Sequence, residues 1–181
     1  MKNMILLGCL LSFFGFAASA YAGFSMNAVS DETVVVNPKK YAMFETTLNR
    51  FEPKHKIWVQ KEAGLTEEDV DSAKSGSAEI VEDPWAVPPK VLDRLPIVEI
   101  RFKSTSRKKL ESFTAENVNK IVAIMIDDEI LAATKVYEPI TDGIIQINSN
   151  WTAEEVSHIV DRLNKIVKRK NEGQQGGDTR R

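Results

Sequence analysis

Hydrophobic and polar positions in the second half of the chain follow patterns that predict strands. Residues 97–102 alternate, as expected of a half-buried strand, whereas residues 121–126 are almost continuously apolar, as expected of a central strand covered on both faces. Two further strands are predicted at residues 129–136 and 143–148, and a helix from about residue 105 to residue 114. These elements predict an antiparallel sheet backed by helices, which is an α+β fold.

A long amphipathic helix is predicted after these strands. Thr152 can cap its first turn, and Glu155, three residues later, completes a capping box. A single apolar stripe follows at helical spacing, made of Val156, Ile159, Val160, Leu163, Ile166 and Val167. The cations at positions 168–170 are expected in the last turn, where they oppose the helix dipole. Residues 171–181 are polar and glycine-rich, so we expect a disordered tail there.

The first half of the mature chain has the pattern of a smaller α/β lobe at residues 23–76. Residues 33–36 are β-branched and predict a short strand, and apolar positions spaced by three and four predict a helix over residues 37–51. Residues 56–61 alternate and predict a second strand. A short helix is predicted over residues 66–76, because a threonine can cap its start and a glycine can end it.

Residues 77–96 differ in composition from both flanking regions. They contain Pro84, Pro88, Pro89 and Pro96. Proline fixes its own φ angle and moves the preceding residue out of the helical region, so this segment is predicted to be an extended connector to the second lobe at residues 97–170. Trp85 and Val87 are expected to pack against one of the lobes. The alternative for Trp85 is a place in a groove that receives an apolar partner.

The first 22 residues have the composition of a cleavable signal peptide. Lys2 precedes an apolar run, and Ala20, Tyr21 and Ala22 match the small-x-small pattern of signal peptidase, so cleavage is expected before Gly23. The run is shorter than the roughly 20 residues needed to cross a bilayer. We therefore expect an exported, soluble periplasmic protein. Lipoprotein anchoring at Cys9 is the less favoured alternative.

Charge and cysteine content exclude several functions. Loss of Lys2 with the signal would leave 23 basic residues against 26 acidic residues, a net charge of −3. Non-specific nucleic-acid binding needs a basic surface, so nucleic acid is not an expected partner. Cys9, the only cysteine, would also be lost, which excludes a disulfide framework, a zinc–thiolate site and a thiol nucleophile.

The acidic run Asp127, Asp128 and Glu129 is the most conspicuous candidate for chemistry. It lies between two apolar runs, where a two-residue turn would join antiparallel strands, and aspartate tolerates the left-handed backbone of such turns. A calcium loop needs oxygen ligands spread along the loop with a glycine at the sharp bend, and that spacing is missing. An acid/base pair needs one desolvated carboxyl group, and a turn is well hydrated. We interpret the acids as the turn.

Other catalytic and cofactor patterns are also missing from the sequence. His55 and His158 are isolated, and two histidines without cysteine give no zinc signature. No serine stands in a Gly-x-Ser-x-Gly elbow, and no glycine-rich phosphate loop is present. We therefore expect a non-enzymatic protein with no cofactor and no metal, and the sequence identifies no catalytic, cofactor-binding or metal-binding residue. The alternative is a small periplasmic hydrolase whose site is assembled from residues distant in sequence.

Residues 97–167 resemble a known family in an ordered series of positions. The series comprises Thr114, Asn117, Val118, Ala123, Ile124, Asp127, Pro139, Ile140, Gly143, Gln146, Ile147 and the run from Thr152 to Glu155. In this order they resemble the head subdomain of the first large periplasmic loop of SecD, an accessory subunit of bacterial preprotein translocase. The chain departs from the family pattern at four positions, namely Asp128, Thr134, Asp142 and Ser149.

The resemblance implies a fold that contacts polypeptides outside the inner membrane. The expected partner is an exported polypeptide, a translocase subunit or another envelope protein, and strand addition to an exposed sheet edge is one way to bind it. SecD itself spans the membrane several times and couples proton flow to preprotein movement. We expect no such coupling here, because no membrane helix is predicted after the signal.

Overall fold

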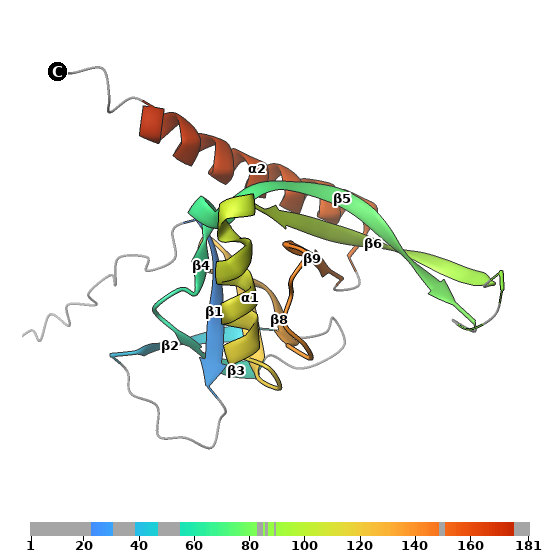
Figure 1. Ribbon diagram of the computed structural model, residues 1–181, viewed down its shortest axis with the longest axis horizontal. Helices are drawn as coiled ribbons and strands as arrows, with labels where there is room; N and C mark the ends of the chain where they lie inside the picture. The colour runs from blue at the N-terminus through green and yellow to red at the C-terminus, as the bar shows by residue number, and fades with distance from the viewer. Residues whose placement is uncertain are drawn as a thin grey trace, which may run out of the picture.

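The computed structural model describes residues 23–30, 39–46, 55–82, 85, 87–88, 90–148 and 151–175. Within them the chain forms two antiparallel sheets and two α-helices (Figure 1), which confirms the α+β class. The strands are β1 (Phe24–Ser30), β2 (Tyr41–Thr46), β3 (His55–Gln60), β4 (Leu65–Thr66), β5 (Val70–Val81), β6 (Val91–Phe102), β7 (Ile121–Ile126), β8 (Glu129–Lys135) and β9 (Ile144–Ile147). The helices are α1 (Arg107–Glu116) and α2 (Ala153–Gln175), with 3-10 turns η1 (Glu67–Asp69) and η2 (Ser104–Ser106).

Strand β1 lies at the centre of the larger sheet, whose order is β2-β3-β1-β7-β8, with β4 also paired to β1. Phe24 pairs with Ile126 and Ala28 with Val122, while Val29 pairs with Val59 of β3. Residues 23–76 and 97–170, which we predicted as separate lobes, therefore contribute strands to one sheet. The alternation of apolar residues in β1 was the available sequence signal for this strand.

Strands β5 and β6 form one long hairpin that projects from the body of the molecule (Figure 1). Strand β9 pairs only with Val98–Arg101 of β6, so in the described part of the chain the hairpin beyond Ile97 is a two-stranded ribbon. We call its described residues between 77 and 96 the arm. The predicted connector over the same residues is wrong, because they pair across the hairpin. Pro96 is tolerated in β6 because it lies beyond the last pairing with β9.

Two helices predicted in the first half of the chain are strands instead. Residues 41–46 of the predicted helix 37–51 form β2, which pairs with β3 along its length and packs Phe44 beside Ile57 and Val59. Of the predicted helix 66–76, only the turn η1 is helical before β5 begins. Strand pairing outweighed the local helical pattern in both places. The predicted strand at 33–36 lies outside the described residues, as does the predicted signal peptide.

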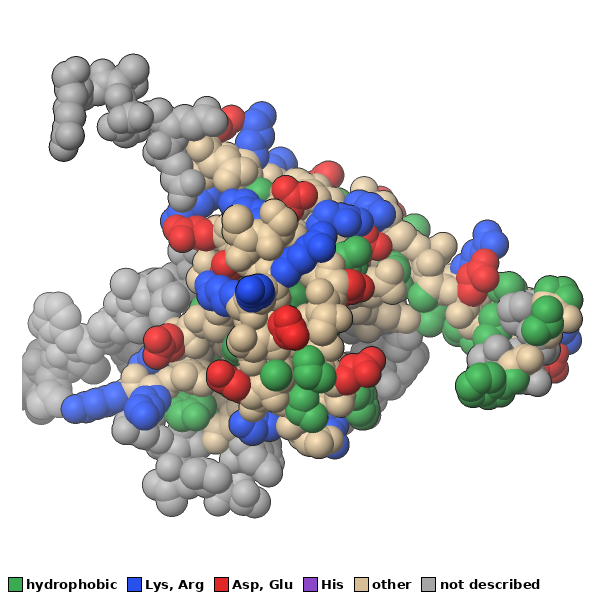
Figure 2. Space-filling view, in the orientation of Figure 1, with side chains coloured by type: hydrophobic (Ala, Val, Ile, Leu, Met, Phe, Trp, Pro, Cys, Tyr) green, Lys and Arg blue, Asp and Glu red, His purple; other side chains and the backbone are tan. Residues whose placement is uncertain are grey.

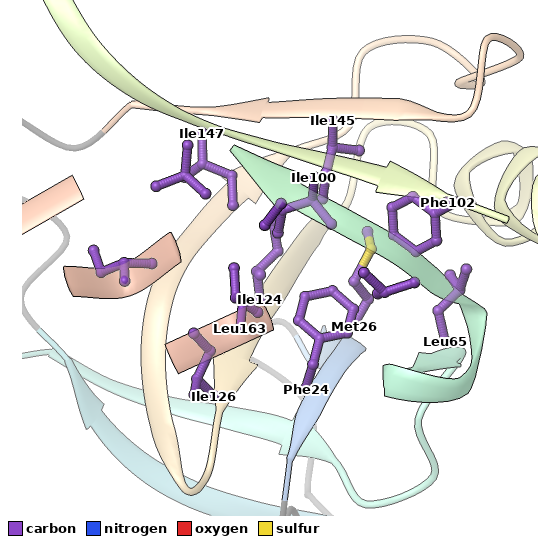
Figure 3. Packing of buried hydrophobic residues seen from close by; sticks show 14 of the residues in the cluster. Phe24, Met26, Leu65, Ile100, Phe102, Ile124, Ile126, Ile145, Ile147 and Leu163 are labelled. Atoms are coloured by element: carbon purple, nitrogen blue, oxygen red, sulfur yellow. The ribbon is translucent and has the colours of Figure 1, made fainter. Parts of the chain in front are cut away.

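A single large core joins both sheets and both helices (Figure 3). The larger sheet contributes Phe24, Met26, Val122, Ile124 and Ile126, and the smaller sheet contributes Val98, Ile100, Phe102, Ile145 and Ile147. Helix α2 adds Val156, Ile159, Leu163 and Val167, which confirms its predicted apolar stripe, and α1 adds Leu110. A second cluster, Ile57, Val59, Ala123 and Met125, lies on the opposite face of the larger sheet. Strand β7 is thus covered on both faces, as predicted.

Helix α2 begins as predicted but ends later. Thr152 N–H donates to Glu155 Oε2 at 2.8 Å, and Glu155 N–H donates to Thr152 Oγ1 at 3.2 Å, which confirms the capping box. The helix continues to Gln175, so the cations at 168–170 are not in its last turn, and the tail predicted from residue 171 starts inside the helix. No helix in the described ranges is both long enough and apolar enough to span a membrane.

Candidate protein-binding surface

Apolar side chains are exposed together at the end of the arm. Trp85 is 89% exposed and Val87 is 95% exposed, and Figure 2 shows hydrophobic side chains gathered there. The strand ends beside them add Ile80, Val91 and Leu92, which are also exposed. The prediction that Trp85 and Val87 pack against a lobe is therefore wrong. A cluster of exposed apolar side chains on a projecting element is typical of a protein-binding surface.

Polar contacts across the ribbon hold the arm in this shape. Arg94 donates to Glu79 Oε1 from Nη2 at 2.7 Å and from Nε at 3.2 Å. Nearer the end, Lys90 Nζ lies 2.8 Å from Glu82 Oε2, and the Glu82 N–H donates to the Lys90 carbonyl at 3.0 Å. Exposed ion pairs of this kind contribute little stability, at about 0–1 kcal/mol each. The backbone pairing of β5 with β6, such as Ile80 with Asp93 and Val81 with Val91, sets the register that brings the apolar residues together.

Glu99 links the three strands at the base of the arm. Its carboxylate lies 3.1 Å from Lys74 Nζ of β5 and 3.3 Å from Arg101 Nη2, and it accepts from Gln146 Nε2 of β9 at 3.4 Å. Partial burial alone would raise the pKa of Glu99, but the hydrogen bonds from Lys74 and Gln146 and the charges of Lys74 and Arg101 lower it below its ordinary value. The base of the arm is therefore fixed to the smaller sheet by an ionised side chain.

A second apolar surface lies in a cleft between β8 and β9, which are the last strands in their sheet orders. The cleft has a volume of about 570 Å³, and its apolar lining includes Ile124, Leu131, Ile145 and Ile147. An extended peptide beside either strand would have both backbone partners and apolar pockets, as in strand addition.

The acidic run forms the turn that the sequence predicted. Asp127 and Asp128 connect β7 and β8, and Asp127 has a φ of 45°. Arg162 of α2 lies 2.8 Å from Glu129 Oε2 and 3.7 Å from Asp127 Oδ2, so the carboxylates are held in ion pairs. Among the described residues no group of three or more His, Cys, Asp or Glu could hold a metal ion. His158 is exposed, as expected, and the His55 side chain lies outside the described residues.

Asp69 is the buried acid that comes closest to a catalytic environment. Its Oδ1 accepts from Ser106 Oγ at 2.9 Å, and its Oδ2 accepts from Lys109 Nζ at 2.6 Å and from the Thr66 N–H at 3.0 Å. Burial would raise the pKa of Asp69, but these hydrogen bonds and the charge of Lys109 outweigh burial and lower it. The lowered pKa favours the ionised form with both oxygens hydrogen-bonded, which is the arrangement of a buried ion pair and differs from that of a general acid, whose pKa is raised.

Comparison with known proteins agrees with this fold. Residues 42–165 match the family described as SecDF, P1 head subdomain. Protein translocase subunit SecD of Acidaminococcus fermentans is 39% identical over 64 residues, and that of Calditerrivibrio nitroreducens is 41% identical over 64 residues. Each match covers 35% of this chain, and the chain spans only 15% and 12% of those two proteins.

A solved structure supports the fold independently of these sequence matches. The structure described as a membrane component SecDF that enhances protein export aligns with a TM-score of 0.51 and 20% sequence identity, over 81% of this chain and 63% of that chain. Since the family match extends over more than half of the sequence, this chain belongs to the SecDF P1 head family.

Proposed function

We propose that this chain is a non-enzymatic periplasmic module that binds exported polypeptides while they are unfolded. The observation that carries the proposal is the cluster of exposed apolar side chains at the end of the arm. An unfolded chain presents apolar side chains in no fixed arrangement, and a small apolar surface on a projecting ribbon can contact many such sequences. The SecDF protein in the similar solved structure is described as a membrane component that enhances protein export, which supports exported polypeptides as the class of partner.

The cleft between β8 and β9 offers a second contact for the same partner. A polypeptide held at the arm could place an extended segment beside β8 or β9, where main-chain hydrogen bonds tolerate varied sequences. Two weak contacts on one chain raise the overall affinity through effective concentration. The arm and the cleft can be tested separately because they lie on different elements.

Photo-crosslinking in cells tests the proposal directly. A photoreactive amino acid is placed at Trp85 on the arm, at Ile144 in the cleft, or at exposed His158 on α2. We expect the probe at Trp85 to give adducts with many different exported polypeptides, the probe at Ile144 to give fewer, and the probe at His158 to give the fewest. One dominant adduct with a single envelope protein, or equal labelling at all three positions, would contradict the proposal.

A binding measurement with purified protein compares variants on the arm with a control variant elsewhere on the surface. A fluorescently labelled, permanently unfolded polypeptide is titrated, and its anisotropy gives the affinity. Trp85→Ser should weaken binding by about tenfold or more, as truncation of an aromatic anchor typically does. Ile80→Ser on the arm should weaken binding, whereas Ile121→Ser should not, although the two isoleucines are similarly exposed, at 40% and 42%. Equal effects of the two isoleucine substitutions would show that the arm is not the binding surface.

A further inference from the structure

Gly23 is held at both of its backbone polar groups by a single residue of the β7–β8 turn. The Asp127 N–H donates to the Gly23 carbonyl at 2.7 Å, and the Gly23 N–H donates to Asp127 Oδ1 at 3.1 Å. Since Phe24 pairs with Ile126, these contacts extend the ladder between β1 and β7 by one residue. The backbone nitrogen of Gly23 is therefore within hydrogen-bond distance of the Asp127 carboxylate.

A second carboxylate, that of Glu67 in η1, lies against the Cα of Gly23. A Cβ at this position would be 2.9 Å from Glu67 Oε2 and 3.3 Å from Oε1, and the φ of +113° also requires glycine. The Glu67 side chain is only 17% exposed, so its charge is poorly screened by water. The positive φ thus favours glycine at position 23, and the Glu67 carboxylate lies in the space that a side chain would take.

The carboxylates around Gly23 outnumber the cations that pair with them. Arg162 serves Asp127 and Glu129, at 3.7 Å and 2.8 Å, and Lys170 serves Glu67 and Glu68, at 3.7 Å and 3.0 Å. In the described structure around Gly23, two cations thus form ion pairs with four carboxylates. A positive charge at the nitrogen of Gly23 would reduce the remaining negative charge.

We infer that signal peptidase cleaves before Gly23 and that the new α-ammonium group becomes a counter-ion of Asp127 and Glu67, fastening β1 to the β7–β8 turn and to η1. The sequence Ala20, Tyr21 and Ala22 is the small-x-small pattern for this cleavage. Water is the co-reactant: the bond from the Ala22 carbonyl carbon to the Gly23 nitrogen breaks, the carbon gains hydroxyl, and the nitrogen gains a proton. At neutral pH the amine takes a further proton from solvent and is charged.

Two neighbouring carboxylates favour the charged amine, so the pKa of the Gly23 α-amino group should exceed the ordinary value of about 7.7–8.0. A group whose pKa is higher in the folded state stabilises the fold below its unfolded pKa. That stabilisation is lost as the pH rises through the folded pKa. The other charged groups that face this site are the carboxylates of Asp127, Glu67, Glu68 and Glu129 and the cations of Arg162 and Lys170. The hydrogen bond and charge of Glu68, together with Glu67, raise the pKa of Lys170.

Processing is tested first, by expressing the full chain with its own leader in a bacterial host. The protein is isolated from the periplasm, and intact mass and N-terminal sequencing give the first residue. We expect Gly23. A mature protein that begins at any other residue would overturn the inference, but it would leave the arm proposal open to its own binding test.

The ion pair is then tested by comparing the form that begins at Gly23 with a form that keeps Ala22, which moves the ammonium group by one residue. NMR titration gives the α-amino pKa, and thermal unfolding is followed from pH 7 to pH 10. We expect the higher pKa in the Gly23 form, together with a fall in Tm that is about 2–4 °C larger over this range. Equal pKa values and equal pH profiles in the two forms would overturn the ion pair.

Side-chain variants identify the counter-ion. Asp127→Asn keeps an acceptor for Gly23 but removes the charge, so it should lower the α-amino pKa and flatten the pH profile. Asp128→Asn is the matched control in the same turn and should change neither. If Asp127→Asn does not fold, the comparison of the Gly23 and Ala22 forms still decides the question, because it changes no side chain of the turn.

Discussion

The side-chain amide of Asn164 forms two hydrogen bonds with the backbone of Ala73. Its Oδ1 accepts from the Ala73 N–H at 2.9 Å, and its Nδ2 donates to the Ala73 carbonyl at 2.9 Å. Ala73 lies in β5, an outer strand of the smaller sheet, so one side chain of α2 takes the place of a neighbouring strand there. Unpaired edge groups favour association with other chains, and this contact satisfies one donor and one acceptor.

Asn164→Asp should destabilise the protein by about 1–3 kcal/mol, because the carboxylate cannot donate to the Ala73 carbonyl and repels it. Urea unfolding measures the change. Asn171→Asp, the same substitution at an exposed position of α2, is the control and should change the free energy of unfolding by less than about 0.5 kcal/mol. Similar losses for both variants would mean that the contact with Ala73 contributes nothing specific.

Asp69→Asn should also destabilise the protein by about 1–3 kcal/mol, because Lys109 and Ser106 lose a charged acceptor in a buried site. Asp71→Asn is the matched control, since Asp71 is exposed and its Oδ2 accepts a hydrogen bond from its sequence neighbour Ser72 at 3.3 Å. The free energy of unfolding from denaturant titrations at pH 7 is the measurement. An effect of Asp71→Asn as large as that of Asp69→Asn would contradict this account.

The same aspartate predicts a pH dependence. Since the pKa of Asp69 is lower in the folded state, its stabilisation is present above the unfolded pKa of about 3.9 and is lost as the pH falls through the folded value. The difference in stability between the wild type and Asp69→Asn should therefore be constant above about pH 5 and shrink below about pH 4. A difference that stays constant down to pH 2 would show that ionisation of Asp69 is not involved.

Leu163→Ala should cost about 2–5 kcal/mol, because Leu163 is fully buried in the core and its truncation leaves a cavity. Leu92→Ala removes the same atoms from the arm, where the side chain is 55% exposed, and should change stability by less than about 0.5 kcal/mol. Thermal and urea unfolding measure both variants. A large loss for Leu92→Ala would mean that the arm is part of the cooperative core.

Gly64→Ala should destabilise the protein by about 1–3 kcal/mol, because the new Cβ would overlap with the ring carbons Cδ2 and Cε2 of Phe113 on α1. In a Phe113→Ala background the same change should cost less, and a double-mutant cycle measures this coupling. Gly76→Ala is the comparison, since its Cβ would lie 3.2 Å from Cγ1 and 3.4 Å from Cδ1 of the flexible Ile97 side chain. Equal costs of Gly64→Ala in both backgrounds would contradict the proposed overlap with Phe113.

Elements fixed by local signals were predictable from the sequence. Strand β7 matches its predicted range of 121–126, because a strand buried on both faces is apolar throughout. The start of α2 follows from the capping box of Thr152 and Glu155, whose members are three residues apart. The turn at Asp127 was also predictable, because two apolar strands flank a short polar run.

Elements fixed by distant partners were not predictable. The arm depends on pairs such as Glu79 with Arg94, which lie on opposite strands, so its prolines suggested a connector instead. Trp85 was identified as unexplained, but its exposure depends on the hairpin that carries it. Tyr41 and Phe44 are three residues apart, which suggested one face of a helix, but in β2 they point to opposite faces, and only the pairing with β3 reveals the strand.

The central position of β1 also has a consequence for how the protein reaches its folded state. In a chain translocated from its N-terminus, as proposed above, β1 emerges long before β7, yet Phe24 pairs with Ile126. The larger sheet therefore cannot close until most of the polypeptide has emerged, and contacts between such distant residues form slowly. Until then β1 lacks its β7 partner, and an unpaired strand of this kind favours aggregation.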